Sequence, residues 1–185
     1  QDGATQSLPA LQEAYQVEFK AARGSPVTAP SLTQIVNGTF SITEGSQFSD
    51  GDGPATYSSR GIWADSGWDQ YTRYWDLMKA TGDGSLLDLS SVTSIDAGVS
   101  SSGDDLNLQQ ISALAGGVID LSGLQTILGP VSGQNDIRFI VGPCSGIEDP
   151  CIVDPTRTKI HLNHLQRIET TYAGHSQQTR FDIQD

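Results

Sequence analysis

The apolar positions of the chain follow one short pattern that occurs five times. Each copy has an aliphatic residue or Ala first, Pro, Ser or Asn second, an aliphatic residue fourth, Gln or Thr fifth and an aliphatic residue or Ala seventh. The copies begin at Leu8, Ala29, Leu89, Leu121 and Leu162. A unit that recurs in this way reflects the architecture of the whole chain. We therefore predict a fold built from repeated coils.

Segments with alternating apolar and polar residues accompany these copies. Tyr15, Val17, Phe19 and Ala21 alternate with polar residues, which is the period of a half-buried strand. The spacing of three within each copy could indicate a helix, but flanking Gly, internal Pro and many Ser and Thr oppose one. We interpret each coil as a strand, a turn with Gly, a second strand and a corner that carries two more inward aliphatic residues.

This pattern predicts an all-β, right-handed β-solenoid of about six coils, in one domain that covers residues 1–185. The pattern is interrupted by an irregular insertion at about 48–73 and by a loop insertion at 142–158. A solenoid tolerates such insertions because each coil contacts only its neighbours.

The two ends of the sequence complement each other. Residues 181–185 read as a strand without a following repeat, and residues 1–14 read as a repeat without a preceding strand. Joined together, they complete one coil. We therefore expect one unit of a tandem array, or an open-ended solenoid that stacks on copies of itself through Leu8, Leu11, Phe181 and Ile183.

The segments 118–127 (VIDLSGLQTI) and 31–42 (SLTQIVNGTFSI) carry a resemblance to known repeats. The first, with its Gly-rich joints, resembles the repeats of large secreted bacterial β-solenoid proteins. The second resembles the coil of receptor L domains, which are right-handed β-helices. The resemblance implies an adhesin-like or structural protein that is secreted or held at the cell surface, and it assigns no reactive residue.

The amino-acid composition excludes some classes of binding partner. The chain has 22 acidic and 10 basic residues and a net charge of -12, which argues against binding to nucleic acid. Twenty Gly and only 17% charged residues suit a β protein rich in turns. No apolar run reaches the roughly 18 residues that a membrane-spanning helix needs.

Cys144 and Cys151 are the two cysteines of the chain and lie close together in a segment with Gly and Pro. A zinc site needs four ligands, whereas two nearby cysteines in an oxidising compartment can close a small loop. We therefore predict a disulfide between them.

Five aromatic residues cluster beside the predicted insertion, namely Trp63, Trp68, Tyr71, Tyr74 and Trp75. Aromatic rings can pack an insertion against the solenoid, or can form a platform that contacts a glycan or a surface protein. The sequence leaves both interpretations open.

Two groups of carboxylates offer oxygen ligands for calcium: Asp50 and Asp52 with Asp65, or Asp104 and Asp105 beside Asp83 on a neighbouring coil. Neither an EF-hand loop nor a Gly-Gly-x-Gly-x-Asp repeat is present, so solvated turn carboxylates are the alternative. In the repeat alignment, Asp88, Asp120 and His161 share one position between inward aliphatic residues, which predicts an outward polar ladder.

The chain has no Gly-x-Ser-x-Gly motif, no phosphate loop and no supported Cys/His pair. Asp76 and Arg138 lie on predicted strands without a second reactive group, so no catalytic residue and no cofactor other than calcium are predicted. We expect a structural module that binds copies of itself end to end. The alternatives are a module that binds carbohydrate or a receptor, and a polysaccharide lyase or hydrolase.

Overall fold

The computed structural model describes residues 3–60, 73–97, 107–129, 136–142, 157–169 and 178–183. These residues form three parallel sheets of six strands each and no α-helix. Sheet A contains β1 (Gln6–Ser7), β4 (Pro26–Ala29), β7 (Gln47–Asp50), β10 (Leu86–Asp88), β13 (Val118–Asp120) and β16 (Lys159–His161). Sheet B contains β2 (Glu13–Tyr15), β5 (Gln34–Val36), β8 (Ala55–Ser58), β11 (Val92–Asp96), β14 (Thr126–Leu128) and β17 (Arg167–Glu169). Sheet C contains β3 (Glu18–Ala21), β6 (Thr39–Thr43), β9 (Arg73–Thr81), β12 (Asn107–Leu114), β15 (Asp136–Gly142) and β18 (Gln178–Ile183).

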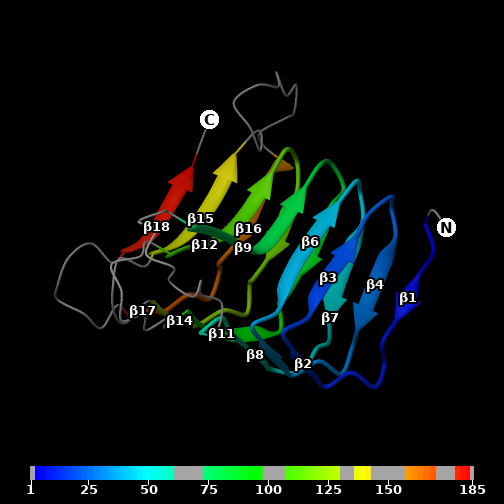
Figure 1. Ribbon diagram of the computed structural model, residues 1–185, viewed down its shortest axis with the longest axis horizontal. Coiled ribbons are helices and arrows are strands. Elements are labelled where there is room, and N and C mark those ends of the chain that lie inside the picture. The colour runs from blue at the N-terminus through cyan, green and yellow to red at the C-terminus, as the bar shows by residue number, and fades with distance from the viewer. Residues whose placement is uncertain are drawn as a thin grey trace.

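The chain visits sheets A, B and C in turn six times, so each coil contributes one strand to every sheet. Figure 1 shows the first coil, in blue, and the last coil, in orange to red, at opposite ends of the stack. The structure confirms the all-β prediction of a right-handed β-helix with about six coils. Each coil has three strands, where the sequence predicts two strands and a bent corner.

The recurrent motif forms the corner between sheets A and B. In all five copies, the amide of the fourth residue donates a hydrogen bond to the carbonyl of the first, as Val92 does to Leu89 at 3.0 Å. In the copies that begin at Ala29, Leu89, Leu121 and Leu162, the first and fourth residues pack on the core, and the seventh lies on the inner face of sheet B. In the fourth coil, Leu89, Val92 and Ile95 are all fully buried. The spacing of three is therefore a turn between two strands.

Equivalent inward residues of successive coils lie one above the other. In sheet C the register aligns Phe40 with Met78, Met78 with Ile111 and Ile111 with Phe139. In sheet B, Ile35, Tyr57 and Ile95 form a similar column. Each such side chain contributes roughly 1.5–3 kcal/mol on burial, and together these residues form one continuous core.

Buried hydroxyl groups join neighbouring coils at the corner between sheets C and A. The Ser25 amide donates to Ser46 Oγ at 3.1 Å, the Gly45 amide to Ser85 Oγ at 3.0 Å, and the Gly116 amide to Thr158 Oγ1 at 2.8 Å. These bonds give the turn amides partners away from water.

The strand predicted over residues 15–21 is broken in the structure. Gln16 has a φ of 53°, so β2 ends at Tyr15 and β3 begins at Glu18. The change of direction ends the alternation, and Tyr15 and Val17 are exposed. Only Phe19 and Ala21 are buried as expected. Asn37, with the same φ, makes the same corner one coil later.

The sequence predicts an irregular insertion at about 48–73. Residues 47–50 and 55–58 form β7 and β8, which are regular strands of the third coil. Residues 61–72 lie outside the described residues, as does most of the loop predicted at 142–158. The described part of the chain has no helix that could span a membrane.

Candidate functional site

The large exposed apolar side chains of the described residues all lie on the first and last coils. They are Leu8, Tyr15 and Val17 at one end and Ile168 and Phe181 at the other. Ile168 is 45% exposed, whereas Ile127, its partner in the register of sheet B, is fully buried. Phe181 is 45% exposed and Phe139 beside it 2%. Within the described residues, no further coil covers Ile168 and Phe181, which accounts for their exposure.

Every sheet ends on these two coils. β1, β2 and β3 form one edge of sheets A, B and C, and β16, β17 and β18 form the other. The outer edge of each of these strands has no further strand beside it within the described residues. Such an edge is a template for pairing with another strand. Of the residues that the sequence assigns to the ends, Leu8 and Leu11 lie at the corner after β1, and Phe181 and Ile183 lie on β18.

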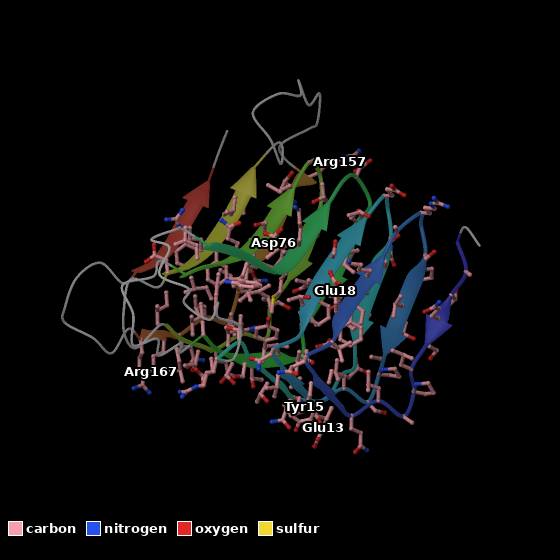
Figure 2. All side chains as sticks on the ribbon, viewed as in Figure 1. Glu13, Tyr15, Glu18, Asp76, Arg157 and Arg167 are labelled. Carbon is pink, nitrogen blue, oxygen red and sulfur yellow. The ribbon has the colours of Figure 1, made fainter. Side chains whose placement is uncertain are left out.

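A polar groove of about 360 Å³ lies on the outer face of sheet C. Its lining comes from three coils and consists of Glu18, Thr39, Phe40, Ser41, Thr43, Asp76, Lys79 and Thr81. Figure 2 shows Glu18 and Asp76 on this face. Lys79 Nζ lies 3.4 Å from Asp76 Oδ2, and Lys20 Nζ lies 2.9 Å from Glu18 Oε2. The groove therefore offers hydroxyl groups and carboxylates to a polar ligand.

The sequence analysis identifies Asp76 as a strand residue but does not predict this groove, because the residues that line the groove lie on three separate strands, β3, β6 and β9. Only the strand register brings them together. Arg138, the other strand residue of interest, lies 3.4 Å from Asp136 Oδ2. In the register of sheet C, Arg180 of β18 lies beside Arg138.

Asp50 occupies an inward corner position that is aliphatic or Ala in all five copies of the motif. Its side chain is buried, and burial raises the pKa of its carboxyl to about 7, with the nearby Asp88 charge adding to the rise. Ser91 Oγ donates a hydrogen bond to Asp50 Oδ2 at 2.5 Å, which opposes the shift. Oδ1 is buried without a hydrogen-bond partner. The sequence marks Asp50 as a turn carboxylate and gives no sign of this burial.

The calcium prediction stays a prediction. Asp52 is exposed while Asp50 is buried, and Asp104 and Asp105 lie outside the described residues. The described residues contain no group of three His, Cys, Asp or Glu side chains that could hold a metal ion.

The predicted polar ladder is present on sheet A, where Asp88 pairs with Asp120 and Asp120 with His161. Asp88 Oδ1 accepts a hydrogen bond from the Ser90 amide at 3.1 Å, and Asp120 Oδ1 accepts one from the Ser122 amide at 2.8 Å. Both carboxylates therefore stabilise the corner that follows their strand.

Trp75 lies on β9 and packs, partly buried, against the core. Tyr74 lies beside it on the same strand. The other residues of the predicted aromatic platform and of the predicted disulfide lie outside the described residues, namely Trp63, Trp68, Tyr71, Cys144 and Cys151.

A scan against protein-family models, a search of curated proteins and a search of solved structures each found no match. Function is therefore inferred from the geometry of the end coils, the sheet C groove and the Asp50 corner.

Proposed function

We propose that this chain is an extracellular or cell-surface structural module that assembles end to end by coil stacking, as a component of a fibre, matrix or filament. One observation carries the proposal: the large exposed apolar side chains of the described residues lie only on the first and last coils. In a stacked solenoid, each coil buries its apolar surface against a neighbour, and the end coils need a cap or another coil.

The two ends supply both parts of a stable contact. Burying the exposed half of Ile168 and of Phe181 contributes roughly 1 kcal/mol each. The open edges of three sheets add backbone hydrogen bonds, whose partners are set by strand register. The same interactions that hold the coils together within the chain then hold one copy to the next.

Association tests this proposal directly. We expect the wild-type chain to form longer species as its concentration rises, and Ile168→Lys to weaken that association at least tenfold, because a charge replaces an apolar contact at the end. Sedimentation velocity and electron microscopy measure both effects. Thr56→Lys is the control, since Thr56 is exposed on β8 in the middle of sheet B. A wild-type chain that stays monomeric at high concentration contradicts the proposal.

A glycan-binding role is the second candidate, and the sheet C groove favours it. Its Thr and Ser hydroxyls and two carboxylates match the hydrogen-bonding needs of a sugar, and its volume of about 360 Å³ suits a small saccharide. The sequence analysis separately proposes the aromatic residues at 63–75 as a platform that contacts a glycan. No observation favours catalysis, so no reaction is proposed.

Blocking the groove tests the second candidate. If the groove binds saccharides, Ser41→Leu is expected to reduce binding on a glycan array more than tenfold, because Ser41 lies in the groove lining. Thr126→Leu makes the same kind of change on sheet B and is expected to leave binding unchanged. Absence of wild-type binding to every saccharide on the array rules this role out for those sugars.

A further inference from the structure

We infer that the contact between copies has one direction: the last coil of one copy lies on the first coil of the next, in the strand register that relates coils within the chain. The inference rests on the proposed end-to-end assembly and names its partner, a second copy of this chain. It also names the two surfaces that meet and the residues that align across them.

The two end coils differ in charge although the whole chain is acidic. Among the described residues of the last coil, beginning at residue 157, four basic residues outnumber two acidic ones: Arg157, Lys159, Arg167 and Arg180 against Glu169 and Asp182. Among residues 3–23 of the first coil, Glu13 and Glu18 are balanced by Lys20 and Arg23. Contact between two last coils brings like net charges together, whereas contact between a last coil and the neutral first coil does not. Charge therefore favours contact between a last coil and a first coil.

One outward column on sheet B shows this difference residue by residue. The strand register aligns Glu13, Gln34, Thr56, Ser94, Thr126 and Arg167 in successive coils. The four residues in the middle of this column are uncharged. Glu13 is the acidic residue on the first coil, and Arg167 is the basic residue on the last. Figure 2 shows Glu13 and Arg167 on the same side of the molecule. One more coil in register sets Arg167 of one copy beside Glu13 of the next.

Sheet C also aligns residues of opposite charge across the contact between two copies. Extending the β15–β18 register by one strand aligns position 180 with Glu18 and position 182 with Lys20. The sequence has Arg at 180 and Asp at 182, which are opposite in charge to those partners. Opposite charges directly across neighbouring strands stabilise that pairing, and like charges destabilise it.

The apolar surfaces of the ends also differ, so neither end is complementary to itself. On the last coil, Ile168 and Phe181 are half exposed at core positions. On the first coil, Ala14 and Phe19 at the matching positions are buried, and the exposed apolar surface comes from Leu8, Tyr15 and Val17. A contact between two different surfaces is heterologous, and its repetition without closure produces a filament.

Charge reversal at the sheet B column tests the direction. Glu13→Arg and Arg167→Glu, each alone, place like charges across the contact, and each is expected to weaken association roughly tenfold. The chain that carries both substitutions is expected to regain wild-type association, and so is an equimolar mixture of the two single variants. Sedimentation velocity measures all four samples, and thermal unfolding checks that each variant is folded. Asp52→Arg, exposed in the turn between β7 and β8 of the third coil, controls for net charge.

The outcomes separate this inference from the proposed function. If the wild-type chain does not associate, the proposed assembly fails. If it associates but the doubly substituted chain is as weak as the single variants, then Glu13 and Arg167 do not pair across the contact and the register inferred here is wrong. If all charge variants associate as the wild type does, then Glu13 and Arg167 do not face each other, and the inferred direction and register are wrong while assembly stands.

Discussion

Replacing Gly51 by Ala is expected to destabilise the fold by about 3 kcal/mol or more, enough to prevent folding if the chain is marginally stable. A Cβ at Gly51 would lie 1.9 Å from the carbonyl oxygen of Pro30 and 2.6 Å from its carbonyl carbon. Both atoms belong to the backbone of the neighbouring coil, so relief requires the second and third coils to separate at this corner.

Gly53 provides a matched control two residues away in the same turn. A Cβ at Gly53 would meet nothing within 4 Å, so Gly53→Ala is expected to leave stability nearly unchanged. Urea unfolding followed by circular dichroism compares the two variants with the wild type. Equal midpoints for Gly51→Ala and Gly53→Ala would show that the two coils are not packed as closely at Pro30 as described.

Replacing Asp50 by Asn is expected to stabilise the protein at pH 8 and to have little effect near pH 4. In the folded chain, burial raises the pKa of the Asp50 carboxyl from 3.8 to about 7. Folding therefore favours the protonated form, and stability falls as the pH rises from about 4 to about 7, then stays at the lower level. Asn is neutral throughout and can keep a hydrogen bond to Ser91. The shift corresponds to roughly 2–4 kcal/mol at pH 8.

Unfolding free energies measured from pH 4 to pH 9 test this expectation. Asp52→Asn is the control, because Asp52 lies in the same turn with its side chain exposed. The difference between wild type and Asp50→Asn is expected to open between pH 4 and pH 7, and the Asp52→Asn curve is expected to run parallel to that of the wild type. A difference that stays constant with pH would mean that Asp50 does not titrate in the folded protein.

The repeat motif predicts the fold because its residues are set by contacts within one corner. The Val92–Leu89 turn bond and the inward position of Ile95 depend only on residues close in the sequence, so the pattern carries them. The break at Gln16 is not predictable in this way, because nothing in the alternation of apolar residues shows a positive φ at that position.

Most of the candidate sites cannot be predicted from the sequence, because they depend on the strand register between coils. The sheet C groove joins Glu18 to Asp76 across three strands, and the environment of Asp50 includes Ser91 from the next coil. Leu8 and Phe181, in contrast, are predictable as end residues, because Leu8 begins the first copy of the motif and Phe181 lies in the last alternating segment of the sequence. The structure differs in one respect, since both end coils are complete, with one strand in each sheet.

The parallel stacking of coils also determines how the molecule responds to force. Hydrogen bonds between strands of successive coils run along the axis that joins the first coil to the last (Figure 1). Tension along that axis pulls these bonds open directly and separates one coil at a time, instead of shearing long strands past each other. A filament of such modules would therefore yield by stepwise peeling, beginning at the coil with the weakest neighbour, and would lengthen considerably before it breaks.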